Sequence, residues 1–210
     1  MRILESLQRH LGAYVCHVLV RPWGEVSPQR GRLRYAVLTE AQVLAWCRDP
    51  ALGLERRQAE RALRRGDVCV GGFQDNGPVC YVWYAYRAAP HVGGLWVEFG
   101  RGSGYAYKAF VRPEYRGLGL GAELYAKAAE ICPKKGTQRG ISFIGVDNAP
   151  SLRAAERTGW QRVGYAAYAW PFGGTFTFSS PGARRYGFRF YAPSGSALVT
   201  GLRGTRTSAA

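Results

Sequence analysis

The sequence of 210 residues predicts an α/β domain in which helices cover a mixed β-sheet. Three observations lead to this class. Hydrophobic residues make up 47% of the chain, which is enough for a sizeable core at this length. Segments with strand character alternate with segments of helical periodicity. A glycine-rich turn joins one strand to an amphipathic helix near the middle of the chain.

The N-terminal part of the chain contains clear start and stop signals. Leucines at helical spacing predict a first helix, and Thr39 with Gln42 forms a capping-box pattern at the start of a second one. The residues 74–77, Gln-Asp-Asn-Gly, are typical of a tight turn between two strands. The predicted elements are a helix over 3–11, a strand over 14–20, a loop over 21–31, a strand over 33–37, a helix from 39 to about 47, a basic helix over 54–65, and strands over 68–73 and 79–86.

The C-terminal part continues the alternation. Leu120, Leu124 and Ala128 share one helix face, and Pro133 and Gly136 end that helix. The predicted elements are a glycine-rich loop over 88–103 with a short strand at 95–99, a strand over 105–111, a helix over 118–131, a strand over 141–146, a helix over 150–158, strands over 163–170, 175–178 and 186–191, and a fraying tail over 194–210.

Composition limits the classes of partner and cofactor. The net charge of +15 favours polyanions such as CoA phosphates, acidic carrier proteins or nucleic acids, and a compositional bias toward arginine without any such partner is the alternative explanation. The five cysteines show no Cys-x-x-Cys spacing and the three histidines no ligand spacing, so no disulfide framework and no metal cofactor are expected. No apolar run approaches the roughly 20 residues that span a bilayer. We therefore expect a cytoplasmic protein without a membrane span.

The turn over residues 109–122 carries the most chemical information. Gly117, Gly119 and Gly121 lack Cβ atoms, so the backbone can approach a ligand closely there. The helix that follows begins with unpaired N–H groups and the positive end of its macrodipole. Such a turn is suited to a phosphate or a diphosphate. Its spacing fits neither the Walker A motif nor the dinucleotide fingerprint.

The residues 111–121 read Val-x-Pro-x-Tyr-Arg-x-x-Gly-x-Gly. This pattern resembles the acyl-CoA-binding motif of the GCN5-related N-acetyltransferase (GNAT) superfamily. The resemblance implies that backbone N–H groups of the loop hold the CoA diphosphate. It also implies that the end of the preceding strand pairs with the pantetheine and steadies the thioester oxygen.

A second segment about 30 residues later strengthens the resemblance. A strand is followed by Asn148-x-x-Ser151, a short helix and Arg157-x-Gly159-Trp160, which is similar to the next element of the family. The resemblance implies that this segment lines the pantetheine arm, whereas helix capping is the alternative role of Asn148 and Ser151. The residues that the resemblance assigns to acyl-CoA binding are Ala109, Phe110, Val111, Arg116, Gly117, Leu118, Gly119, Leu120, Gly121, Ala122, Asn148 and Ser151.

The resemblance covers roughly residues 33–170 and implies the GNAT fold, which is a central mixed, mostly antiparallel twisted sheet flanked by helices. Around it we expect an N-terminal helix–strand extension over 1–31 and extra C-terminal strands. The acyltransferase domain then spans residues 32–192, and a flexible tail spans residues 193–210.

The groups that move protons are less clear. Many family members carry a tyrosine acid four residues before the glycine of the Gly-aromatic pair, and here that position is Ala155. Glu98, beside apolar Trp96, Val97 and Phe99, is one candidate base, because desolvation raises a carboxyl pKa. Asp147 is the second candidate. A salt-bridged surface carboxylate and a turn-forming residue are the respective alternatives.

The predicted function is N-acyl transfer from acetyl-CoA or a longer acyl-CoA to a primary amine of a small molecule or peptide, a reaction of class EC 2.3.1. The helices at 39–65, the loop at 88–103 and the C-terminal strands are expected to build the acceptor groove. Three alternatives stay open: an acyl carrier protein as donor, a macromolecular acceptor such as aminoacyl-tRNA or a protein, and a non-catalytic acyl-CoA-binding domain. The acceptor and a homodimeric state are left undetermined.

Overall fold

The computed structural model describes residues 12–23, 32–75, 77–171 and 174–193. The helix predicted over 3–11, the tail over 194–210 and most of the loop over 21–31 lie outside the described residues. The strands are β1 (Tyr14–Pro22), β2 (Arg34–Val37), β3 (Val68–Gln74), β4 (Gly77–Ala85), β5 (Ala89–Pro90), β6 (Trp96–Glu98), β7 (Ser103–Val111), β8 (Arg139–Gly145), β9 (Gln161–Ala169), β10 (Phe176–Ser179) and β11 (Arg189–Tyr191). The α-helices are α2 (Glu40–Trp46), α3 (Arg56–Arg64), α4 (Leu120–Ile131), α5 (Ala149–Glu156) and α6 (Pro181–Arg184), with 3₁₀ turns at Pro50–Leu52, Val92–Gly94 and Pro113–Tyr115.

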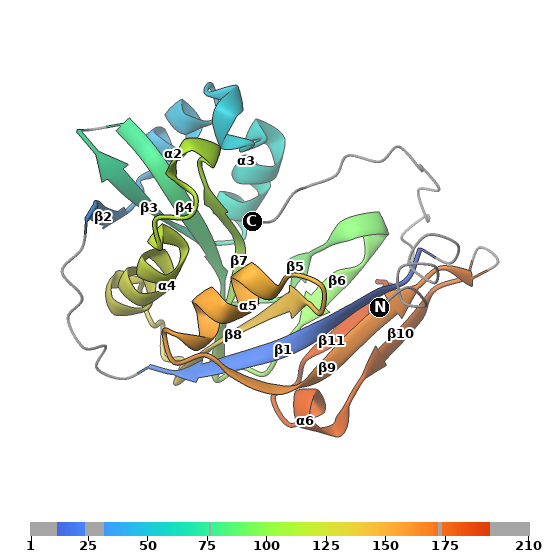
Figure 1. The fold of residues 1–210 in the computed structure, drawn as a ribbon. Coiled ribbons are helices and arrows are strands. Elements are labelled where there is room, and N and C mark those ends of the chain that lie inside the picture. The colour runs from blue at the N-terminus through green and yellow to red at the C-terminus, as the bar shows by residue number, and fades with distance from the viewer. Residues whose placement is uncertain (1–11, 24–31, 76, 172–173, 194–210) are drawn as a thin grey trace.

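An eight-stranded sheet in the order β10-β9-β1-β8-β7-β4-β3-β2 forms the centre of the domain (Figure 1). Its neighbouring strands are antiparallel except for the β7–β8 pair, which is parallel. A smaller sheet in the order β11-β6-β5 completes the β content. The predicted mixed, mostly antiparallel sheet with flanking helices is therefore confirmed.

The strand predicted for the N-terminal extension, β1, lies inside the main sheet between β8 and β9 (Figure 1). Its pairing with β8 runs from Cys16 opposite Gly145 to Pro22 opposite Arg139. Six consecutive residues of β1, from Cys16 to Arg21, are buried, which is typical of a strand covered on both faces.

The two faces of the main sheet are covered differently, because successive side chains of a strand point to opposite faces. On β4, Val82 and Tyr84 pack in one cluster with residues of α4 and α5. The alternate residues Tyr81 and Trp83 pack in a second cluster with α2 and α3. A third cluster joins Tyr105 of β7 to residues of the β11-β6-β5 sheet. We call the side covered by α4 and α5 the helix face, and the side covered by α2, α3 and the smaller sheet the opposite face.

Two local predictions are confirmed, the capping box and the short strand at 95–99. At the start of α2, the Thr39 side chain accepts from the Gln42 backbone amide and the Gln42 side chain accepts from the Thr39 amide, which is the predicted capping box. The short strand expected at 95–99 is β6. Four of the five cysteines are buried, and all five are free thiols. Among the described residues, no helix has the length and hydropathy of a membrane-spanning segment.

The strand predicted over 186–191 is only partly right, because β11 covers three residues and a short helix, α6, precedes it. Ser180 caps α6 by accepting from the Ala183 amide, and Pro181 follows the cap at the first helical position. This Ser-Pro pair was a readable start signal that the sequence analysis did not use. A Cβ atom on Gly182 would lie 1.9 Å from the Val163 carbonyl oxygen, so α6 packs directly on β9.

Truncation of Leu19 tests the central position of β1. Leu19 is fully buried, so Leu19→Ala is expected to lower the free energy of unfolding by about 2–5 kcal/mol. The control is Val37→Ala on strand β2, where the side chain is 38% exposed and a change within about 0.5 kcal/mol is expected. Denaturant unfolding measures both variants. Equal effects would contradict the placement of β1 between β8 and β9.

Candidate functional site

The parallel strands β7 and β8 at the centre of the main sheet separate after a short stretch of pairing. β7 and β8 pair through only three residue pairs, from Ser103 opposite Arg139 to Tyr105 opposite Ile141. The Ser142 hydroxyl then donates to the Ala106 carbonyl oxygen at 2.8 Å, at the point where the strands separate. Both strands continue beyond it, β7 to Val111 and β8 to Gly145. Their facing backbone edges are therefore not joined to each other past this point.

A β-bulge interrupts β7 just beyond the separation. Tyr107 pairs with Trp83 and Phe110 with Tyr81, so two residues of β7 stand opposite one residue of β4. Lys108 adopts a positive φ of 50°, which is uncommon for a residue with a side chain. A bulge re-aims the neighbouring side chains and interrupts the hydrogen-bond ladder, and bulges are frequent beside active sites.

The predicted glycine turn lies at the end of β7 and leads into α4. Gly117 and Gly119 have φ values of 78° and 80°, in the left-handed region that favours glycine. A Cβ atom built on Gly117, Gly119 or Gly121 would meet no atom of the described residues within 4 Å, so the turn is open with respect to that part of the chain. The backbone amides of residues 117–121 donate to no acceptor among the described residues. These amides and the positive end of the 12-residue helix suit the oxygens of a diphosphate.

Two arginines brace this turn. Arg116 Nε donates to the Val111 carbonyl oxygen at 3.2 Å, and its exposed guanidinium lies 6.0 Å from the Phe110 ring. From the other side, Arg32 donates to the Leu118 carbonyl oxygen at 3.0 Å. Arg32 was not identified from the sequence, because its contact depends on a pairing 86 residues away in the chain.

The Asn148 side chain caps α5 directly after β8. Its oxygen accepts from the Ser151 amide at 3.1 Å, so the alternative role in helix capping is present at Asn148. The predicted contact of Asn148 and Ser151 with the pantetheine stays a prediction. Both residues follow the C-terminal end of β8. Because β7 and β8 are parallel, they lie at the same edge of the sheet as Val111, the last residue of β7.

The two candidate bases lie on different elements, with no interaction between them. Glu98 lies on β6 in the smaller sheet and forms an ion pair with Arg189 Nε at 2.5 Å, with its side chain 42% exposed. Asp147 is exposed in the turn after β8. Ala155, the position where the resemblance would have implied a tyrosine acid, is buried in the helix-face cluster. A catalytic role of Glu98 or Asp147 stays a prediction.

The sequence analysis did not identify the hydrogen-bonded pair of buried Asp67 and half-buried Tyr107 on the opposite face. The only sequence signal at Asp67 is a carboxylate placed directly before an apolar strand, and nothing local links it to a tyrosine 40 residues later. Among the described residues, no group of three or more His, Cys, Asp or Glu side chains could hold a metal ion.

The comparisons with known proteins agree with this architecture. A protein of unknown function from Staphylococcus epidermidis aligns with a TM-score of 0.53 and 11% identity, over 80% of this chain and 65% of that one. A GNAT-family acetyltransferase from Colwellia psychrerythraea aligns with a TM-score of 0.51 and 11% identity, over 79% of this chain and 56% of that one. At these identities the likeness concerns the fold alone.

An acetyltransferase assigned to the GNAT family from Novosphingobium aromaticivorans aligns with a TM-score of 0.49 and 18% identity, over 75% of this chain and 63% of that one. The chain thus spans less than two thirds of the length of these solved proteins. No curated protein matches the chain. Residues 35–160, more than half of the chain, match the model of the acetyltransferase (GNAT) family, and the chain therefore belongs to that family.

Proposed function

We propose that the protein transfers an acyl group, in the simplest case acetyl, from an acyl-CoA thioester to a primary amine of a small molecule or peptide. The observation that carries the proposal is the open glycine turn at the start of α4, beside the parting of β7 and β8. The free amides of residues 117–121 would bind the CoA diphosphate. The pantetheine amides would then pair with the backbone edge of Ala109–Val111.

The reaction requires that the amine and the thioester are held close together and that the charge developing on the carbonyl oxygen is stabilised. The amine nitrogen attacks the thioester carbonyl carbon, the C–N bond forms, and the C–S bond breaks with its electrons on sulfur. A backbone N–H near the β7 bulge would stabilise the oxyanion that develops in between. The nitrogen loses a proton and the departing thiolate gains one.

The opposite face supports the predicted acceptor groove. Of the segments expected to build it, α2 with α3, the loop that contains β5 and β6, and β11 pack on this face, whereas the other C-terminal strands, β9 and β10, extend the main sheet. The acyl group would reach the amine through the parting of the two strands. The donor on one side and the acceptor on the other would therefore meet at the β7 bulge.

A second candidate function is favoured by the net charge of +15. A strongly basic protein attracts acidic macromolecules, so an acyl carrier protein as donor, or aminoacyl-tRNA or a protein as acceptor, is the alternative. Binding of such a polyanion should weaken steeply with salt, whereas binding of a small amine should not.

A matched pair of variants tests donor binding. Gly119 before α4 and Gly136 after it have nearly equal φ values of 80° and 76° and equally open surroundings. Ala at either position should reduce stability by about 1–2 kcal/mol because of the left-handed backbone. Only Gly119→Ala should also weaken acetyl-CoA binding, measured as loss of the thermal stabilisation that a saturating ligand gives. Equal stabilisation of both variants by acetyl-CoA would contradict the proposed site.

Gly121→Leu is the complementary variant. Gly121 lies within α4 and its φ is not positive, so leucine should leave the free protein at least as stable, since it is the better helix former. Its side chain would occupy the open space in front of the amides and should abolish the acetyl-CoA-dependent shift in Tm. Retention of that shift would count against diphosphate binding at this turn.

Thiol release tests the chemistry. With acetyl-CoA and a panel of primary amines, we expect thiol release that depends on enzyme and on amine. Release only with an acyl carrier protein or aminoacyl-tRNA, in a salt-sensitive manner, would support the alternative. Binding of acetyl-CoA without release on any acceptor would reduce the function to a non-catalytic acyl-CoA-binding domain.

A further inference from the structure

The described part of the chain has only two buried carboxylates, Asp67 and Glu123. Glu123 of α4 accepts from the backbone amides of Arg32 and Leu33, so it fastens the start of β2 to the helix face. Within the described residues, the Asp67 carboxylate accepts from side chains and from no backbone amide. It lies between the end of α3 and the start of β3, and its side chain is 1% exposed.

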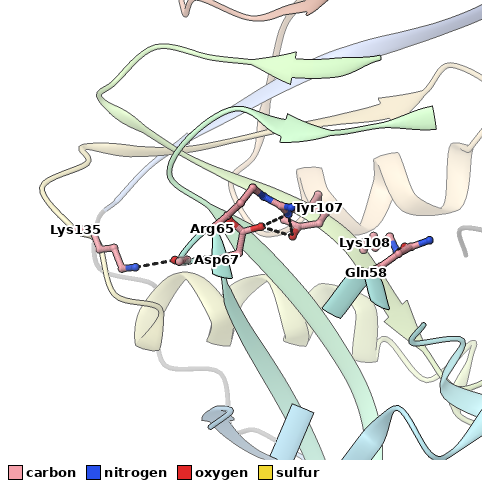
Figure 2. A network of polar contacts seen from close by, with 7 residues as sticks. Gln58, Arg65, Asp67, Tyr107, Lys108 and Lys135 are labelled. Carbon is pink, nitrogen blue, oxygen red and sulfur yellow. Dashed lines mark hydrogen bonds and ion pairs between the residues drawn. The ribbon is translucent and has the colours of Figure 1, made fainter. Parts of the chain in front are cut away.

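The Asp67 side chain is hydrogen-bonded to Tyr107 of strand β7 (Figure 2). The Tyr107 hydroxyl donates to Asp67 Oδ2 at 2.6 Å, and Arg65 Nη2 donates to the same oxygen at 2.6 Å. Arg65 Nη2 also lies 3.4 Å from the Tyr107 hydroxyl oxygen. Arg65 Nε is buried and has no hydrogen-bond partner among the residues that the structure describes. The phenol oxygen of Tyr107 is thereby fixed against a carboxylate.

The position of Tyr107 links this pair to the reaction. It lies two residues after the last β7–β8 pair and directly before the bulge residue Lys108. Its half-buried ring packs against both hydrophobic clusters of the opposite face. The centroid of the Tyr107 ring lies 5.4 Å from that of Tyr105 and 6.3 Å from that of Trp83. Tyr107 therefore lies at the seam between the α2–α3 layer and the smaller sheet, where the proposed acceptor groove meets the bulge.

The neighbourhood determines which proton can move. Burial raises the pKa of the Asp67 carboxyl, while Tyr107, Arg65 and Lys135 oppose that shift. Burial also raises the pKa of the Tyr107 phenol, and the Asp67 charge raises it further. A phenol of this kind stays protonated at neutral pH. It can accept a proton on its oxygen only while its own proton passes to Asp67.

We propose that Tyr107 is a catalytic residue that takes the proton from the attacking amine, and that Asp67 acts through it as a positioning residue and proton store. This inference rests on the proposed function. As the C–N bond forms, the proton of the nitrogen moves to the Tyr107 oxygen and the phenol proton moves to Asp67 Oδ2. The C–S bond breaks, the thiolate takes a proton from water, and Asp67 returns its proton to water, so that no net charge remains.

Removal of one hydroxyl tests the role of Tyr107, with Tyr81→Phe as the matched control. The Tyr81 hydroxyl lies on the same face and donates to the Leu52 carbonyl oxygen at 3.0 Å. Tyr107→Phe loses the hydrogen bond to Asp67 and the longer one from Arg65, whereas Tyr81→Phe loses one hydrogen bond, so the Tm should fall in both variants and at least as far in Tyr107→Phe. The probes are acetyl-CoA with hydroxylamine, an amine that is uncharged at neutral pH, and with the amine panel.

Tyr107→Phe should lower kcat by about 100-fold or more with unchanged acetyl-CoA affinity, since proton transfer by a placed group contributes on this scale. Tyr81→Phe should keep kcat within about twofold. If wild type turns over and the two variants behave alike, this inference fails while the proposed function stands. If wild type binds acetyl-CoA but releases no thiol with any probe, both the inference and the proposed function fail. A variant that loses only acetyl-CoA binding would indicate a defect at the glycine turn and not at Tyr107.

Asp67→Asn separates proton storage from geometry, because asparagine still accepts from Tyr107 but is not basic. In wild type, log kcat with hydroxylamine should fall as pH drops through the raised pKa of Asp67, because the protonated carboxyl can no longer receive the phenol proton. The charged and titratable groups that face Asp67 are Arg65, Lys135, Tyr86 and Tyr107. In Asp67→Asn this acid limb should disappear and the plateau should be about 100-fold lower. An unchanged profile would overturn the inference.

Discussion

The early parting of β7 and β8 is the constraint on which the rest of this domain depends. Two parallel strands in the middle of a sheet would normally exchange backbone hydrogen bonds along their whole length, because unpaired buried amides and carbonyls are unfavourable. Here the pairing ends after Tyr105 and Ile141, and the Ser142 hydroxyl satisfies the next carbonyl, that of Ala106. The strand edges beyond it need an external partner. An extended chain with amide groups, such as pantetheine, would supply one.

Several separate features converge on this parting. The bulge at Lys108 and the glycine turn lie on the β7 side, and the capped start of α5 lies on the β8 side. On the opposite face, the Asp67–Tyr107 pair fixes a phenol next to the bulge. Arg32, Arg116 and the amides of the glycine turn lie where phosphate is expected, whereas Asp67, the one buried carboxylate of the opposite face in the described part of the chain, lies where an amine is expected to lose a proton.

The features that were predicted correctly from the sequence are those that depend on residues close together in the chain. The capping box at Thr39, the end of α4 before Pro133 and the glycine turn between β7 and α4 are set by residues within a few positions of one another. Contacts between distant segments were not predicted. The place of β1 between β8 and β9, the Arg32 contact with the glycine turn and the Asp67–Tyr107 bond all depend on tertiary pairing that no local pattern specifies. The small helix α6 is the exception, since its Ser-Pro start was visible.

The central position of β1 also has a consequence for biosynthesis. On the ribosome, Cys16 emerges long before its partners Gly145 and Ala166 exist, so this strand must wait while most of the chain is made. Pairings of such long sequence separation form slowly and late. Until they form, the apolar segment Cys16–Val20 has no sheet to join, and nascent chains with exposed strands of this kind are prone to aggregation. The strand at the centre of the finished sheet is therefore also an apolar segment that has to be kept from aggregating during synthesis.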